Sequence, residues 1–527
     1  MHSFFRNNVF SISFGTSLSK LAGCLRQIFI AAAFGVGVTY DAFNYAYIIP
    51  GFLLIIIGGI NGPLHNAVVA VLTPLNKKNG GIVLTRVSIK LSILLFGLAI
   101  LIYFNSNLLI ELLAPNLSYE AKSIATYQLR ILTPCIPLSG FIGLSFGALN
   151  SRKKFFLSSI SPAITSLTTI FFILFSWIFN KQNTSSNLLT YTGLLAFATL
   201  TGTFIQFVVQ IWETNKIGLF RLESNIQILK NEERRILKLI IPASISSGLS
   251  QINVFIDMLF ASSFQGAASG LAYGNFLIQA PLGILSNSLI LPLLPKFSKL
   301  RSYRDDKGLQ KKLISGIEYC FLTTIFLTGF FITFNNQIVQ LVFQRGAFDY
   351  SATLKVKNIL IAYAVGIPFY LYRDLLVRTY YSIEKTKLPF KLSFTGIIFN
   401  IFFDWVLIGA PIKNFGNLLP YNFGVVGIII SSVIVNLIIC ILLSLNLRNE
   451  NILLPNFNLL KKIILMSLAS FIDSIFCFTI LKNTNYLNSN FGEFLLLIFG
   501  SLTFFIIYFL LTKCLNVNKV KIYKNII

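Results

Sequence analysis

Charged residues are scarce in this sequence. Only 12% of its 527 residues are Asp, Glu, Lys or Arg, whereas 55% are hydrophobic, and soluble domains contain about 25% charged residues. Apolar runs recur along the whole chain, and the gaps between them are too short for a separate soluble domain. A soluble globular protein is therefore excluded. The first apolar run holds Lys20 and Arg26 and lacks a clear cleavage site, so it does not resemble a removable signal peptide.

Histidine and clustered cysteine are also lacking. The chain has two histidines, His2 and His65, and six scattered cysteines with no CxxC pair. They cannot assemble a zinc site, and the cysteines are typical of small apolar core residues. No loop groups the carboxylates or histidines that a membrane glycosyltransferase or acyltransferase would need. The sequence therefore argues against an enzyme.

Fourteen apolar runs predict transmembrane helices, because a helix needs roughly 20 apolar residues to cross the hydrocarbon. We therefore expect an all-α polytopic membrane protein. The predicted spans are 9–35, 41–72, 86–105, 124–149, 157–180, 189–211, 236–263, 270–295, 314–334, 359–382, 390–410, 423–446, 463–481 and 493–512. Prolines inside spans predict kinks at Pro50, Pro63, Pro134, Pro137, Pro242, Pro281 and Pro368.

The connections between spans alternate in positive charge. The N-terminal segment, the links after even-numbered spans and the C-terminal tail carry 31 Lys and Arg residues, counting with them four that lie near span ends (Arg86, Lys90, Lys238 and Lys391), whereas the other links carry 7. Cytoplasmic loops hold the excess of Lys and Arg. Both termini are therefore predicted to be cytoplasmic, which requires an even number of spans. The net charge of +25 then reports topology and contact with anionic lipid heads rather than nucleic-acid binding.

Some charges remain inside the predicted spans, where each costs on the order of 3 kcal/mol or more. Lys20 and Arg26 share one helix, with no acid between them. They point to different sides, about 9 Å apart along the axis, and this unpaired pair predicts an anion-binding role. Other charges inside the spans include Asp41, Arg130, Asp257, Glu318, Arg373, Asp374, Arg378, Asp404 and Asp473.

A second set of polar residues is anionic. Asn400 and Asp404 are four residues apart and share a helix face. With Asp257 from another span they would suit a small hard cation such as Na⁺. Protonation of Asp404, or a purely structural hydrogen bond, is the alternative.

The chain repeats itself after about 231 residues. The segment AFGVGVTYDAFNYAYIIPGFL resembles SFQGAASGLAYGNFLIQAPLGIL: Phe34 and Phe264 are 230 apart, and Pro50 and Pro281 are 231 apart. One repeat holds six spans, so the two halves run in parallel, and such an arrangement places a cavity between two lobes. We predict an N-terminal lobe (1–215), a C-terminal lobe (216–448) and a final segment (449–527) with spans 13 and 14.

Several motifs occur in the order found in one known family. These are LSKLAGCLRQIFIAAAFGVGVTYDAFNYAYIIP (18–50), GALNSRKKF (147–155), QRGAFD (344–349) and YYSIEKTKLPFK (380–391). They resemble the MurJ (MviN) lipid II flippases of the multidrug/oligosaccharidyl-lipid/polysaccharide exporter superfamily. The resemblance implies a bacterial inner-membrane flippase of lipid II, the undecaprenyl-pyrophosphate-linked peptidoglycan precursor, working by alternating access in cell-wall biogenesis.

The resemblance also implies roles for particular residues. Substrate would contact the central cationic cavity through Lys20, Arg26 and Asp41, aided by Arg373 or Arg378. A sodium site would combine Asp257, Asn400 and Asp404 with Ser432 or Ser431, and Na⁺ would be a coupling ion; no other cofactor is implied. A hydrophobic groove at spans 13 and 14 would hold the lipid tail.

The sequence departs from the family at two places, which leaves other functions open. The segment GFLLIIIGGING lacks an arginine pair that relatives carry, and Phe276 stands where they have an arginine. The alternatives are export of another polyprenyl-linked glycan or of a small molecule such as a cationic drug, or a transport-dead scaffold for other cell-wall synthesis proteins. The cations Lys20 and Arg26 argue against cationic drugs.

Overall fold

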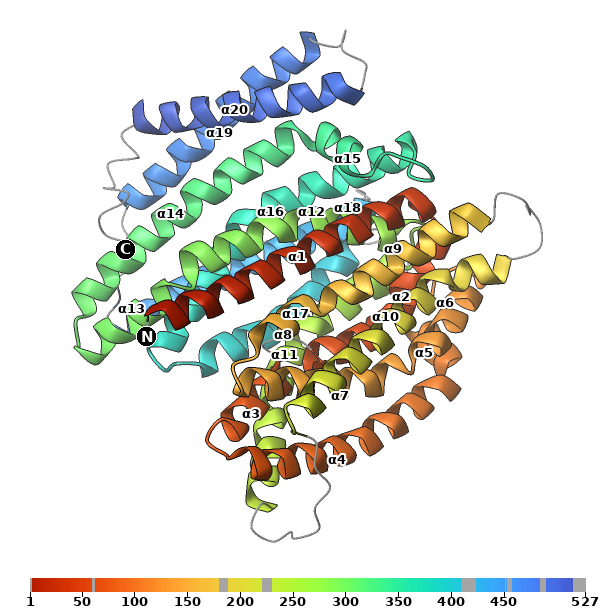
Figure 1. Cartoon of the computed structure of the whole chain (residues 1–527). Coiled ribbons are helices and arrows are strands. Elements are labelled where there is room, and N and C mark those ends of the chain that lie inside the picture. The colour runs from red at the N-terminus through yellow and green to blue at the C-terminus, as the bar shows by residue number, and fades with distance from the viewer. Residues whose placement is uncertain are drawn as a thin grey trace. The chain divides into compact units, whose positions relative to one another are not determined.

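Helices make up all the regular secondary structure in the part of the chain that the computed structural model describes. These residues are 2–58, 62–179, 188–219, 230–408, 423–450, 452, 457–483 and 490–514. They form two compact units, residues 1–269 and 270–527, coloured red to green and green to blue in Figure 1. The expected all-α membrane architecture is confirmed.

The first unit is built around α7, which packs against α3, α4 and α10, while α9 packs against both α1 and α10. Its helices are α1 (His2–Phe34), α2 (Val38–Leu53), η1 (Leu54–Gly58, a π-helix), α3 (Pro63–Leu72), α4 (Lys77–Phe104), α5 (Ser106–Leu113), α6 (Tyr119–Leu132), α7 (Cys135–Ser151), α8 (Phe155–Ile160), α9 (Pro162–Phe179), α10 (Leu188–Lys216) and α11 (Lys230–Ala261). The unit ends within the first turn of α12.

The second unit is built around α16, which packs against α14, α15 and α18. Figure 1 shows α19 and α20 side by side next to α14. Its helices are α12 (Ala267–Leu285), η3 (Ser286–Ile290, a π-helix), α13 (Leu293–Ser302), α14 (Asp306–Thr333), α15 (Asn335–Phe343), α16 (Tyr350–Ser382), α17 (Lys387–Ile408), α18 (Gly424–Asn446), η4 (Leu447–Glu450, 3₁₀), α19 (Phe457–Asn483) and α20 (Asn490–Cys514).

Large apolar side chains cover the outer faces of many helices. In the first unit they include Phe171, Ile178 and Trp212, and in the second Ile398 and Phe471, all more than half exposed. Exposed apolar surface of this extent marks a contact with lipid rather than with water. The apolar runs therefore serve both the core and the bilayer.

Each of the fourteen predicted spans coincides with a helix or a group of helices. Ten helices in the described part of the chain are long and apolar enough to cross a membrane, and the bent pair α6–α7 makes eleven. The other three predicted spans are α2–η1–α3, α11 and α19. The first of these is divided by the π-turn and by Pro63.

The internal repeat is visible in the backbone. Lys153 and Glu384, 231 residues apart, are both non-glycine residues with positive φ, 61° and 62°. Each follows the C-terminus of a long helix, α7 or α16. Helix N-caps recur at the same spacing, since Ser118 accepts from the Ala121 amide and Asp349 from the Ala352 amide. The two halves therefore share local structure as well as sequence.

Prolines interrupt helices at some of the expected places. Pro134 lies where α6 and α7 meet at a bend of 44°. Pro50 and Pro281 precede the π-turns η1 and η3 by four and five residues, because a missing amide and a bulky ring disturb the hydrogen-bond ladder nearby. Pro368, in contrast, lies inside the continuous helix α16.

The boundary between the two compact units lies further along the sequence than the predicted boundary between the first two lobes. The first unit continues to Ser269, because α11 packs against α2, α3, α4 and α5. The lobe boundaries 1–215, 216–448 and 449–527 follow the sequence repeat rather than compactness, and they stay a prediction.

Candidate functional site

The two cations of α1 lie in different surroundings. Lys20 is exposed, whereas Arg26 is half-buried. The Arg26 Nε is fully buried and has no hydrogen-bond partner in the described part of the chain, and neither cation has an ion pair there. The Arg26 guanidinium lies within electrostatic range of Tyr40 and Tyr47 on α2. A buried N–H without an acceptor is costly, so an anion at Arg26 would be stabilised.

Asp41 on α2 has its oxygens occupied by protein donors. Its Oδ2 accepts from the Gly266 amide at 2.5 Å, and its Oδ1 accepts from the amide and hydroxyl of Ser269 at 2.8 and 2.7 Å. These amides stand at the N-terminus of α12, where backbone donors lack partners within the helix. The geometry gives Asp41 a capping role, and its predicted contact with substrate stays a prediction.

The two arginines of α16 differ in their partners. Arg378 Nε donates to Asp374 at 2.8 Å, and Ser286 on η3 donates to the other oxygen of this carboxylate at 2.6 Å. Arg373 donates instead to the Asn436 amide oxygen at 2.8 Å and to the Ser393 hydroxyl at 3.1 Å. Asn436 and Ser393 are neutral, so they do not compensate the positive charge of Arg373, whereas the Asp374 carboxylate compensates that of Arg378.

A buried polar cluster joins α17 to α18. Asn400 and Asp404 are completely buried, and the Asn400 amide donates to Asp404 Oδ2 at 3.0 Å. The hydroxyls of Ser431 and Ser432 lie 3.4 and 3.3 Å from Asn400 Oδ1. The structure thus brings together three of the four predicted sodium ligands, Asn400, Asp404 and Ser432. The fourth, Asp257, is half-buried and belongs to the first unit.

These residues supply oxygen ligands only. Carboxylate, amide and hydroxyl oxygens suit a hard cation, and no group of three His, Cys, Asp or Glu side chains able to hold a metal occurs among the described residues. A monovalent hard cation such as Na⁺ fits this donor set better than a transition metal.

Other charges inside the helices are paired locally. Glu318 on α14 accepts from Lys462 on α19 at 2.6 Å. Arg130 donates to the Ser106 hydroxyl at 2.8 Å and lies over the Tyr103 ring. These protein contacts compensate the charges of Glu318 and Arg130, so neither residue requires a bound ligand.

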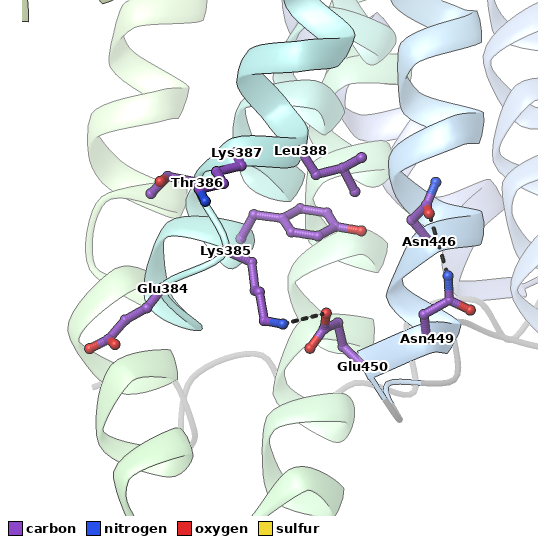
Figure 2. Close-up of a pocket in the computed structure, with 9 residues that line it drawn as sticks. Glu384, Lys385, Thr386, Lys387, Leu388, Asn446, Asn449 and Glu450 are labelled. Carbon is purple, nitrogen blue, oxygen red and sulfur yellow. Dashed lines mark hydrogen bonds and ion pairs between the residues drawn. The ribbon is translucent and has the colours of Figure 1, made fainter. Parts of the chain in front are cut away.

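At least two cavities lie among the described residues of the second unit. One, of about 390 Å³, is lined mostly by apolar residues of α14, α16, α18 and α19, with Arg448 at its edge. This cavity is lined by α19 and not by α20, and the expected tail groove at spans 13 and 14 stays a prediction. The other, of about 440 Å³, is lined mostly by residues with polar or charged side chains and lies at the turn between α16 and α17. Figure 2 shows the Lys385 ammonium pointing to Glu450, at 3.3 Å.

Sequence reasoning missed the neutral partners of the charges. Ser286, Ser393 and Asn436 lie inside apolar helices, and each contacts a charged side chain. The available signal was a small polar residue within a span, which commonly serves as a hydrogen-bond partner between helices.

Comparisons with known proteins agree along almost the whole chain. Residues 30–505 match the family model described as lipid II flippase MurJ. A relative from Synechocystis sp. named probable lipid II flippase MurJ is 39% identical over 428 residues, covering 81% of this chain and 78% of its own.

Solved structures resemble the fold. A structure of lipid II flippase MurJ in an inward closed conformation matches with a TM-score of 0.76 and 25% identity, covering 96% of this chain and 99% of its own. An inward-facing multidrug resistance MATE family transporter matches with a TM-score of 0.60 and 14% identity, covering 84% and 98%. The MATE likeness concerns the fold alone.

Proposed function

We propose, from the premise that this chain belongs to the lipid II flippase MurJ family, that it moves lipid II from the inner to the outer leaflet of a bacterial inner membrane. The family match over residues 30–505 supports this most strongly. The polar head would pass through the protein, because a pyrophosphate and sugars are too costly to place in hydrocarbon, while the polyprenyl tail stays in lipid. The reaction is transport, with no catalytic step.

Arg26 is the residue that we assign first to the pyrophosphate. Its buried Nε without an acceptor would gain a charge-assisted hydrogen bond from a phosphate oxygen. Lys20 on the same helix is exposed and free of ion pairs among the described residues. Lys20 would contact the pyrophosphate as the substrate enters or leaves the binding site. Arg373, which has only neutral partners, is a better candidate for additional contact than Arg378.

Transport by alternating access requires that the affinity of the protein for the pyrophosphate differ between two conformational states. A ligand shifts a conformational equilibrium only by its differential affinity for those states. We therefore propose that Arg26 holds the head group more tightly in the state open to the cytoplasm. Binding of Na⁺ at Asn400, Asp404 and Ser432 would favour one of the two states.

The positive-inside distribution of Lys and Arg supports cytoplasmic termini. The partners would be lipid II and the surrounding membrane lipids, together with other cell-wall synthesis proteins.

Rescue of a bacterium depleted of its own flippase tests the proposal. We expect the wild-type chain to restore growth, Arg26→Ala to fail and Arg26→Lys to rescue partly, because lysine keeps the charge but not the guanidinium. Arg301→Ala is the control: this arginine pairs with Asp306 at 2.7 Å and has no part in the proposed site. Membrane abundance of each variant is measured alongside.

The two main rivals predict a different result from the proposal. A transport-dead scaffold cannot replace the missing transport, so even the wild-type chain would fail to rescue. An exporter of another substrate would also fail to rescue as the wild-type chain at full abundance.

A further inference from the structure

Asp473 lies on the inward face of α19, outside both repeats. Four buried residues of this helix, Met466, Ala469, Ser470 and Cys477, fall at helical spacing on either side of it. Residues on the opposite face, such as Phe471, are exposed and apolar. α19 packs against α14 and α20, so the carboxyl group points into the core of a three-helix bundle. Its side chain is completely buried.

The Asp473 carboxyl has almost no compensation for this burial. The Cys477 thiol, a weak donor, lies 3.7 Å from Oδ1, and Oδ2 has no hydrogen-bond partner among the described residues. The nearby Ser470 hydroxyl is turned away, because it donates to the Ile325 carbonyl of α14 at 3.2 Å.

Among the described residues, the titratable groups around the carboxyl supply no positive charge. On α19 the neighbour is Cys477, and on α20 it is Tyr508, which lies within electrostatic range but donates to the Leu322 carbonyl at 2.9 Å. On α14 the ionisable group facing α19 is Glu318, and it is paired with Lys462, eleven residues before Asp473 in the sequence.

Several other acids in the described helices have donors or cations beside their carboxylate oxygens. Asp374 has Arg378, Glu318 has Lys462, and Asp41 has two amides and a hydroxyl. An ionised carboxylate with only a thiol beside it would be far costlier to bury than the neutral acid. A metal cation is a poor alternative, because it would need several oxygen ligands and the carboxylate on α14, Glu318, is paired with Lys462.

We propose that Asp473 is a proton-binding site of the α14–α19–α20 bundle. The proton resides on the carboxyl group while the three helices are packed, and it is released when α19 separates from its neighbours and water reaches the group. Packing of this C-terminal helix pair is thereby linked to pH, independently of what the chain transports.

Infrared difference spectroscopy of the purified full-length protein in lipid vesicles tests the site directly. We expect the wild-type minus Asp473→Asn spectrum at neutral pH to contain the carbonyl band of a protonated carboxylic acid, shifted in D₂O. Glu318→Gln is the matched control and leaves that band in place, because Glu318 is paired with Lys462. Carboxylate bands in the Asp473→Asn difference spectrum, in place of the acid band, would overturn the proposal.

Thermal stability in detergent gives a second readout. The packed bundle holds the neutral acid and the unfolded chain the charged one, so folding takes up a proton and stability falls as pH rises. We expect Asp473→Asn and Asp473→Ala to flatten this dependence, even if the alanine variant has a lower Tm throughout. Wild-type and Asn variants with parallel Tm profiles from mildly acidic to mildly alkaline pH would count against a proton on Asp473.

Discussion

The two repeats share their backbone but bury different polar groups. α1 carries Arg26 eight residues before Phe34, whereas α11 carries Asp257 seven residues before the matching Phe264. The difference recurs between α9 and α17. Thr169 and Ile173 occupy the positions that correspond, 231 residues later, to Asn400 and Asp404.

This difference shows how one fold can carry two kinds of site. All four positions on α9 and α17 are buried, so the backbone tolerates either a hydroxyl and an alkyl group or an amide and a carboxylate. The first repeat leaves a cation without an acid, and the second buries oxygen ligands. We conclude that the repeat determines the helices, while the exchanged side chains distinguish the proposed anion site of one half from the proposed cation site of the other.

The largest expected effect concerns Asp41, which has no acidic counterpart in the second repeat. Asp41→Ala removes the acceptor of three donors near the start of α12. Each buried donor left unpaired costs about 1–3 kcal/mol, so we expect a loss of about 3 kcal/mol or more, measured by denaturant unfolding in detergent. Asp41→Asn keeps an acceptor and should lose less. Equal stability of Asp41→Ala and wild type would remove the capping role.

A smaller effect is expected at Gly202, whose counterpart in the second repeat is Val433. A Cβ at Gly202 would lie 2.7 Å from the Thr165 Cα of α9 and 2.2 Å from the Thr168 hydroxyl. Gly202→Val should therefore cost roughly 1–3 kcal/mol by overpacking. Ile205→Val on the exposed side of the same helix is the control. If both variants lose the same stability, the close contact of α9 and α10 is not specific to the first repeat.

The smallest effect separates the two matched helix caps, Ser118 and Asp349. Hydrogen bonds from the Ala352 amide and the Ser351 hydroxyl lower the pKa of the Asp349 carboxyl. The stabilisation is therefore complete above the ordinary carboxyl pKa and is lost as pH falls through the lowered value. Ser118→Ala and Asp349→Ala should each cost about 1 kcal/mol near neutral pH. Only the Asp349→Ala deficit should shrink in acid, and a constant deficit for both would contradict the assignment.

The fold was largely predictable because membrane helices follow from apolar length. All fourteen predicted spans coincide with helices, and the repeat found from Phe34 and Pro50 recurs in the backbone. Span 41–72 is less regular than expected because it contains a π-turn and the start of a second helix at Pro63. Hydropathy measures how apolar a segment is and does not detect such local breaks.

The candidate site was less predictable, because sequence spacing tells which residues share a helix face but not what faces them. The i,i+4 spacing of Asn400 and Asp404 correctly placed them together. Nothing in the sequence showed that Asp41 would cap α12 or that Arg373 would find neutral partners on α17 and α18. Such contacts depend on packing between helices far apart in the chain.

Translocation of labelled lipid II in vesicles reconstituted with the purified chain tests the central claim most directly. We expect the wild-type protein to move lipid II between leaflets well above the rate in protein-free vesicles. Arg26→Ala, folded and reconstituted to the same density, should fall at least tenfold, since it loses a charge-assisted contact worth about 1.5–3 kcal/mol. Equal rates for wild type and Arg26→Ala, or a wild-type rate no higher than that of empty vesicles, would contradict the account.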